Sequence, residues 1–241
     1  MAEEAGAGDG RRLQLSGMAG RKAFTPEQEL QILETLRENF SLRDQALIVL
    51  GLNLGYRITE LLSLDVGQVW EAGAVKSRLT ITRSRLKGGR GRRRKAVSSR
   101  SVPINSAVAA VLTPYLFARF GSGPADPAAP LFPSQRKGVR LSRWRANVIV
   151  HLVVKAAGIP DHEAYGTHSL RKTFARKVYK NSGHDINLTR AVLGHAEIGT
   201  TQKYLDVDSG EVEAAVLGLT GDDRLTAAQN LGGRSSAFFA R

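Results

Sequence analysis

The segment from Gly166 to Tyr204 constrains the fold more than any other stretch of the chain, because it has the pattern of short helices separated by glycine turns. Helices are expected at residues 168–181, 186–193 and 200–204. Gly194 stands at one expected helix C-terminus, where glycine can adopt the left-handed conformation that ends a helix. Four side chains of this helical segment could act together on a phosphate: His168, Arg171, His195 and Tyr204.

Each of these side chains also has an ordinary structural interpretation. A single histidine on a helix is usually structural, and a single tyrosine near a helix end usually packs against its neighbours. The combination becomes more specific with Arg57, which lies in a turn directly after an apolar helix that ends at Gly55. A guanidinium can bind two phosphate oxygens at once. Two arginines, two histidines and a phenol therefore supply the groups needed to bind a phosphodiester and attack it.

These residues and their neighbours resemble the motifs of the tyrosine recombinase (phage-type integrase) family. The motifs of that family are an arginine in G-x-R-x-x-E-L, a hairpin lysine, H-x-x-R, L-G-H and a terminal tyrosine. All five occur here in that order: Gly55–Leu61 with Arg57, then Lys87, His168–Arg171, Leu193–His195 and Tyr204. The resemblance covers roughly residues 24–217. It implies the tyrosine recombinase catalytic-domain fold, which is mainly α-helical with a small antiparallel β-sheet (α+β).

The resemblance also implies how each residue would act on DNA. Arg57 and Arg171 would bind the non-bridging oxygens and stabilise the charge of the transition state. Tyr204 would attack phosphorus to form a 3′-phosphotyrosyl link, with His168 as the base that takes its proton. Three further roles follow: Lys87 as the general acid for the leaving 5′ oxygen, His195 as a hydrogen-bond donor to a non-bridging oxygen, and Glu60 as an orienting residue. No metal ion or other cofactor is expected.

The first part of the chain carries clear helix-start signals. Thr25 is an expected N-cap, Pro26 suits the first helical position, and Gln28 completes a capping box. A second helix, between Ser41 and Gly55, is apolar nearly all round and is therefore expected to be buried. Two more helices are expected before Gly166, at residues 105–120 and 142–157.

A basic β-hairpin is expected in the middle of the chain. Residues 79–82 and 101–104 are typical of strands, and from Lys76 to Arg100 there are eleven lysines or arginines and no acid. Such a run alone could equally be a solvated loop, but beside the recombinase motifs it predicts contacts with DNA phosphates. Lys87 best matches the hairpin lysine of the family, and Lys95 is the alternative. The DNA-binding residues expected here are Arg85, Arg90, Arg92, Arg93, Arg94 and Lys95.

The composition favours a polyanionic partner. The chain has 35 lysines and arginines against 22 acids, with a formal net charge of +13 and a pI of about 10.5. A ribosomal or membrane-surface protein would also be basic, but neither would need the five motifs, so double-stranded DNA is the expected partner. A second cluster expected to contact the DNA backbone is Arg136, Lys137, Arg140 and Arg143.

The sequence also limits the environment of the chain. It contains no cysteine, which excludes disulfides, thiolate metal sites and a cysteine nucleophile. No apolar run approaches the ~20 residues that a membrane-spanning helix needs, and the N-terminus lacks the apolar core of a signal peptide. An intracellular protein is expected, located in the cytoplasm in association with DNA and without membrane contact.

Three regions are expected: a flexible tail at residues 1–22, the catalytic domain at 23–219 and a C-terminal tail at 220–241. The C-terminal tail is a candidate for exchange between protomers of a homo-oligomer on DNA, while the free chain could be monomeric. The separate helical clamp domain of longer family members is not expected within this sequence, because only about 23 residues precede the first helix. The leading function is a site-specific recombinase or integrase. The alternative is a DNA-binding accessory or regulatory protein that keeps the fold without strand exchange.

Overall fold

The computed structural model describes residues 21–82, 99–121, 123–136, 138–195, 197–202 and 204–205. The loop of the basic hairpin, the C-terminal tail and most of the N-terminal tail lie outside these residues. In chain order the elements are α1 (Pro26–Asn39), α2 (Leu42–Leu54), α3 (Ile58–Leu62), η1 (Val66–Gln68), β1 (Trp70–Glu71), β2 (Ala74–Val75), β3 (Arg78–Ile81), β4 (Arg100–Pro103), α4 (Ser106–Phe120), α5 (Arg143–Ala156), η4 (His162–Ala164), α6 (Thr167–Asn181), α7 (Ile186–Leu193) and α8 (Ile198–Gln202). The described chain is mainly helical with short antiparallel strands, as the resemblance implied.

The capping box predicted at the start of α1 is confirmed. Oγ1 of Thr25 accepts from the backbone N of Gln28 at 3.2 Å, and Oε1 of Gln28 accepts from the backbone N of Thr25 at 3.0 Å. Just before this cap, Phe24 stacks on Tyr165 with 4.8 Å between ring centroids, and its backbone N donates to Oγ1 of Thr173 at 2.8 Å. The segment that leads into α1 therefore packs against the N-terminal half of α6, where two of the predicted catalytic residues lie.

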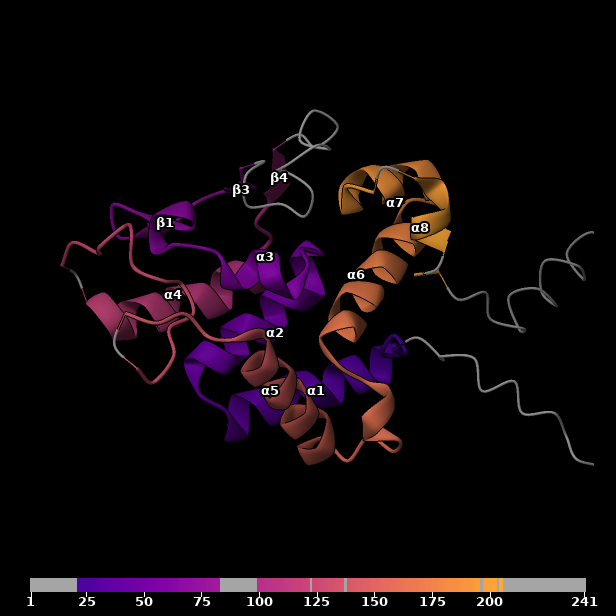
Figure 1. Cartoon of the computed structure of the whole chain (residues 1–241), viewed down its shortest axis with the longest axis horizontal. Helices are drawn as coiled ribbons and strands as arrows, with labels where there is room; N and C mark the ends of the chain where they lie inside the picture. The colour runs from indigo at the N-terminus through magenta and orange to yellow at the C-terminus, as the bar shows by residue number, and fades with distance from the viewer. Residues whose placement is uncertain are drawn as a thin grey trace, which may run out of the picture.

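Helix α2 lies at the centre of the larger hydrophobic core. Residues 46–52 and Leu54 are buried, as the apolar sequence predicted. The helix packs against α4 and α6, and Figure 1 shows it in the middle of the helical part of the molecule. Its position fixes the turn that follows, which carries Arg57.

The C-terminal end of α2 requires glycine. Gly55 has a φ of 59°, in the left-handed region that favours glycine. A Cβ atom added there would lie 2.1 Å from Cδ1 of Phe174 in α6. Both the backbone conformation and the close approach therefore exclude a side chain, and the absence of one lets the end of α2 lie directly against α6.

The strands form two separate two-stranded antiparallel sheets. In the sheet of β3 and β4, Leu79 lies opposite Val102 and Ile81 lies opposite Arg100, so both strands start one residue earlier than predicted. The sheet of β1 and β2 was not predicted from the sequence. Its strands have two residues each, which is too short for an alternating pattern to be visible.

The second half of α6 forms a smaller hydrophobic cluster with α7 and the residues after α8. Phe174 and Leu193 are buried in this cluster, and Tyr204 packs against it. Figure 1 shows α7 and α8 gathered at one end of α6, away from α1 and α5. Gly194 ends α7 with a φ of 66°, as predicted. Within the described ranges, no helix has the length and apolar character needed to cross a membrane.

Candidate active site

Arg171 is almost completely buried, with 1% of its surface exposed. Its Nη1 donates to the carbonyl of Gly55, and its Nη2 donates to the carbonyl of Leu193 at 3.0 Å. The same Nη2 lies 2.8 Å from Nε2 of His195. Burial, together with two neighbouring arginines, lowers the pKa of Arg171 to about 10. The guanidinium therefore keeps its positive charge at neutral pH.

His195 follows Gly194 directly and is also buried, with 6% of its surface exposed. Its Nε2 faces Arg171, and its Nδ1 lies 2.9 Å from Oγ1 of Thr201. Burial and the positive charge of Arg171 lower the pKa of His195 to about 3, so the ring is neutral at neutral pH. In this arrangement Nε2 accepts from an arginine, so the predicted donation from His195 to a phosphate oxygen would require these contacts to change, and it stays a prediction.

Tyr204 lies beside this pair, two residues after α8 ends. Its ring centroid is 5.2 Å from that of His195 and 5.7 Å from Cζ of Arg171. Its backbone N donates to the carbonyl of Thr201 at 2.9 Å, and its side chain is half-buried. The structure thus brings together three residues that the sequence motifs singled out separately.

The other four tyrosines of the chain are less suited to act as a nucleophile. Tyr56, Tyr115 and Tyr165 are buried, and burial raises the pKa of Tyr56 to about 12. Tyr179 is half-buried, but its ring lies edge-on to His184 with 5.0 Å between the centroids. Tyr204 therefore stands out by its position next to an arginine and a histidine of the motifs.

Arg57 and Glu60 form an ion pair at the start of α3. Nη1 of Arg57 lies 3.0 Å from Oε1 of Glu60, whose side chain is 2% exposed. The charge of Arg57 contributes to the lowered pKa values of both Arg171 and His195, which indicates that the three side chains lie near one another. Glu60 thus contacts Arg57 directly, and its role as an orienting residue stays a prediction.

His168 lies in the first turn of α6, with part of its surface exposed. Partial burial lowers its pKa below the ordinary histidine value, and the positive charges of Arg171 and Arg143 lower it further. The ring is therefore unprotonated at neutral pH, which is the form that can take a proton. Its role as the base for Tyr204 stays a prediction.

Arg100 is a half-buried cation of the site that the sequence reasoning did not single out. Its Nη2 donates to the carbonyl of Leu54 at 2.9 Å and its Nη1 to that of Gly55 at 3.3 Å. Its guanidinium also lies over the ring of Tyr56, 4.1 Å from the centroid. The available signal was its position as the last cation of the basic run, directly before the apolar strand pattern.

The residues predicted to bind DNA fall into three groups. Arg136 and Arg143 are exposed, as a phosphate contact requires. Arg140 differs, because its guanidinium donates to the carbonyl of Leu64 at 2.7 Å and pairs with the carboxylate of Asp65. These bonds give Arg140 a structural role, and its DNA contact stays a prediction. The other residues predicted to bind DNA lie outside the described ranges, as does the predicted general acid Lys87: Arg85, Arg90, Arg92, Arg93, Arg94, Lys95 and Lys137.

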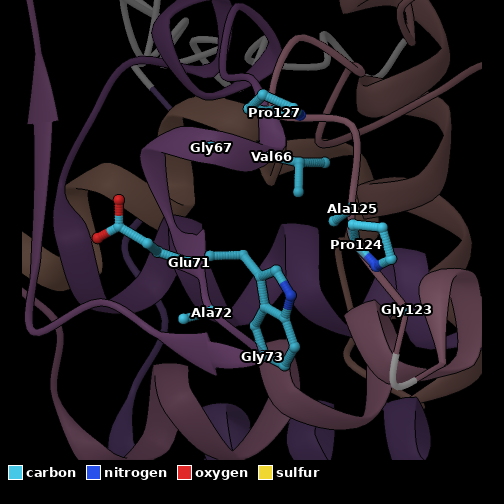
Figure 2. Close-up of a pocket in the computed structure, with 10 residues that line it drawn as sticks. Val66, Gly67, Glu71, Ala72, Gly73, Gly123, Pro124, Ala125 and Pro127 are labelled. Carbon is cyan, nitrogen blue, oxygen red and sulfur yellow. The ribbon is translucent and has the colours of Figure 1, made fainter.

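A pocket of about 290 Å³ lies elsewhere in the fold, between the β1–β2 sheet and the loop after α4. In Figure 2, Pro124 and Ala125 lie on one side of it, and the carboxylate of Glu71 points away from them. None of the predicted site residues lines this pocket. Its lining residues are Val66, Gly67, Trp70, Glu71, Ala72, Gly73, Gly123, Pro124, Ala125 and Pro127.

The fold and the cluster together define a class of protein. A mainly helical domain that holds a buried, charged arginine and a partly exposed one near a phenol and two neutral imidazoles has the groups to bind an anion next to a potential nucleophile. A model of the phage integrase family matches residues 22–211 of the sequence. The chain therefore belongs to the phage integrase family.

Two curated relatives illustrate the similarity. Tyrosine recombinase XerC of Caldanaerobacter subterraneus subsp. tengcongensis is 30% identical over 195 residues, which cover 80% of this chain and 49% of the relative. Tyrosine recombinase XerC of Rhodospirillum centenum is 36% identical over 169 residues, which cover 70% of this chain and 43% of the relative. The chain thus spans about half the length of such curated relatives.

Solved structures show the same fold. The crystal structure of XerA recombinase matches with a TM-score of 0.65 and 22% identity, over 84% of this chain and 67% of that chain. The structure of XerH site-specific recombinase bound to difH substrate matches with a TM-score of 0.59 and 25% identity, over 81% of this chain and 53% of that chain. The expected tyrosine recombinase catalytic-domain fold is therefore confirmed.

Proposed function

We propose that this chain is the catalytic part of a site-specific DNA recombinase, which cleaves and rejoins DNA strands through a 3′-phosphotyrosyl intermediate on Tyr204. The observation that carries the proposal is the joint position of Tyr204, His195 and Arg171. The phenol ring lies 5.2 Å from the imidazole and 5.7 Å from the guanidinium carbon. A phosphate bound at Arg171 would therefore lie next to the phenol.

The proposed reaction begins with phosphate binding by Arg57 and Arg171. Arginine pairs neutralise the charge that builds up on the non-bridging oxygens as a nucleophile approaches phosphorus. Arg57 is partly open to solvent, with 26% of its side chain exposed. Among the described residues nothing accepts a hydrogen bond from the buried Nε of Arg171. Both guanidiniums thus have donors to offer an anion.

In the chemical step, Oη of Tyr204 attacks phosphorus and the bond from phosphorus to the 5′ oxygen breaks. The phenolic proton passes to His168, and Lys87 gives a proton to the leaving oxygen. A new bond joins Tyr204 to the 3′ phosphate. Attack by the 5′ hydroxyl of another strand then breaks this bond and rejoins the DNA, because the phosphodiester energy is kept in the intermediate.

Double-stranded DNA is the proposed substrate and partner. The net charge of +13 and the exposed side chains of Arg136 and Arg143 support it, as does the difH substrate in the XerH structure. Strand exchange requires several active sites, so we expect a homo-oligomer on DNA, with residues 220–241 as the candidate segment for exchange between protomers. A DNA substrate also favours an intracellular location, which we propose to be the cytoplasm.

The alternative is a DNA-binding accessory or regulatory protein that keeps the fold without strand exchange. Such a protein has no need of a nucleophile, whereas this chain has Tyr204 next to the buried pair of Arg171 and His195. The presence of both histidines and both arginines of the motifs also speaks for an enzyme. No specific observation favours the accessory role.

A library of DNA duplexes tests the proposal for any target sequence. Duplexes with a randomised core and a nick would be incubated with the full chain, because a nick lets the released 5′ end diffuse away and traps the covalent product. DNA that stays attached after denaturation would be captured and sequenced. Enrichment of one sequence family, attached through a 3′ phosphate, would support a site-specific recombinase. Recovery no higher than in a reaction without protein would contradict it.

A further inference from the structure

We propose that Thr201 is a positioning residue. Its hydroxyl fixes the tautomer of His195 that accepts a hydrogen bond from Arg171, and its carbonyl holds the turn that carries Tyr204. The inference rests on the proposed function, because it concerns the same site. Thr201 lies in α8 and is completely buried, with 0% of its surface exposed. A hydroxyl buried in this way needs a hydrogen-bond partner, and its partner is His195.

The contacts of His195 determine where its proton lies. Arginine has only donors, so an Nη2 that lies 2.8 Å from Nε2 requires Nε2 to be unprotonated. The proton of the neutral ring is then on Nδ1, which lies 2.9 Å from Oγ1 of Thr201. The hydroxyl oxygen of Thr201 is therefore the acceptor that favours this tautomer over the other.

The other tautomer of His195 would displace the guanidinium of Arg171. It would direct an N–H of His195 at an N–H of Arg171, and two donors at hydrogen-bond distance repel each other. Arg171 would then have to move away from the carbonyls of Gly55 and Leu193 that it now binds. Because Arg171 is the proposed ligand of the scissile phosphate, a shift of its guanidinium would slow cleavage. Overall DNA affinity depends on many phosphate contacts and would change less.

The backbone of Thr201 makes a second connection. Its carbonyl accepts from the backbone N of Tyr204 at 2.9 Å, so one residue is bonded both to the imidazole and to the turn that carries the phenol. A side-chain substitution removes the first bond and leaves the second in place. The contribution of the hydroxyl can therefore be measured separately from that of the turn.

Two substitutions form a matched pair. Thr201→Val keeps the volume and the β-branch but removes the acceptor, whereas Thr201→Ser keeps the hydroxyl and removes a methyl group. With a nicked duplex that wild type attacks, single-turnover adduct formation should be about 10- to 100-fold slower for the valine variant and within about threefold of wild type for the serine variant. DNA dissociation constants should stay within about twofold for both, because Arg171 would be only one of many phosphate contacts. Equal rates for valine and wild type, or a rate loss matched by an equal loss of affinity, would overturn the proposal.

The tautomer itself can be measured on the wild-type chain, so the proposal stays testable even if the valine variant does not fold. Nuclear magnetic resonance of protein labelled with ¹⁵N and ¹³C in histidine distinguishes a proton on Nδ1 from one on Nε2. The signal of His195 is identified by its absence from the His195→Asn variant. A proton on Nδ1 in wild type and in Thr201→Ser is expected, and a proton on Nε2 in wild type would overturn the proposal. A wild-type chain that shows the Nδ1 tautomer but forms no adduct with any duplex would refute the proposed function and not the tautomer.

Discussion

Glu60 holds Arg57 with both oxygens of its carboxylate: Oε1 lies 3.0 Å from Nη1 of Arg57, and Oε2 accepts from the backbone N of Arg57 at 2.8 Å. The side chain of Glu60 is 2% exposed, whereas that of Arg57 is 26% exposed. The carboxylate of Glu60 is thus shielded from water, whereas the guanidinium of Arg57 is partly open to it. One residue fixes the arginine while leaving part of its guanidinium accessible to an anion.

We expect Glu60→Gln to slow covalent attachment to DNA by about tenfold or more, because a buried charged hydrogen bond contributes about 1.5–3 kcal/mol. The amide keeps the shape of the carboxylate but loses the charge that orients Arg57. The measurement is the single-turnover rate at saturating DNA. Glu71→Gln is the matched control, since Glu71 is 74% exposed and pairs with Lys76 at 3.4 Å, where an ion pair contributes little. Equal rates for the two variants would contradict this role of Glu60.

We expect Arg100→Lys to slow cleavage by about tenfold, although it keeps the charge of the hairpin. Arg100 donates to the carbonyls of Leu54 and Gly55 with two different nitrogens, and the carbonyl of Gly55 also accepts from Arg171. A lysine has a single nitrogen and cannot form the same pair of hydrogen bonds. Arg78→Lys is the control, because Arg78 lies in the paired strand and donates to Oγ of Ser101 at 3.1 Å on the exposed surface. The single-turnover rates and the free energies of unfolding of both variants would be compared. A cleavage rate for Arg100→Lys that equals the control would show that Arg100 does not position the site.

His195 should make the stability of the fold depend on pH. Its pKa is lowered to about 3 in the folded chain, against about 6.5 in an unfolded chain. Between these two pKa values the unfolded chain binds one more proton than the folded chain. The stabilising contribution of His195 to the free energy of unfolding is therefore fully present above about pH 6.5. It falls as the pH decreases, by at most about 1.4 kcal/mol per pH unit.

The measurement is urea unfolding of wild type and His195→Asn at several pH values between about 7 and 5. Other titrating groups are common to both proteins, so the difference in slope isolates His195. We expect the wild-type stability to fall more steeply toward acid than that of the variant. Parallel pH profiles would contradict the depressed pKa.

Lys87 lies outside the described residues, and its role as the general acid is a prediction from the motif. We expect Lys87→Ala to slow cleavage of ordinary DNA by about 10²–10⁴-fold. Replacement of the scissile 5′ bridging oxygen by sulfur should restore most of the rate, because a thiolate leaves without a proton. Lys95→Ala is the control and should show no such pattern. An equal loss on both substrates would reject Lys87 as the acid and make Lys95 the next candidate.

The sequence predicted most helices well, because the signals for them are local. The capping box of Thr25 and Gln28 joins residues three positions apart. The ends of α2 and α7 were predicted from Gly55 and Gly194, whose positive φ angles are a property of single residues. Such features depend on a few neighbouring side chains and are visible without the tertiary fold.

The contacts that organise the site were not predictable in the same way. Arg100 binds the carbonyl of Leu54, 46 residues earlier in the chain, and no local pattern marks a cation that will meet a distant helix end. Arg140 lies in a basic cluster, and no local pattern indicates that its guanidinium binds the carbonyl of Leu64 and the carboxylate of Asp65. The partnership of Thr201 with His195 likewise depends on how α8 folds back on the end of α7. Side-chain partners of this kind are decided by packing.

The most direct test of the central claim is to identify the residue that carries the DNA. Wild type, Tyr204→Phe and Tyr179→Phe would be incubated with a nicked duplex that wild type attacks. The adducts would be digested with nuclease and protease, and mass spectrometry would locate the peptide that carries a nucleotide. We expect a nucleotide on Tyr204 in wild type and in Tyr179→Phe, and no adduct in Tyr204→Phe although that variant still binds the duplex. An adduct with Tyr204→Phe, or a nucleotide on any other residue of the wild-type chain, would contradict it.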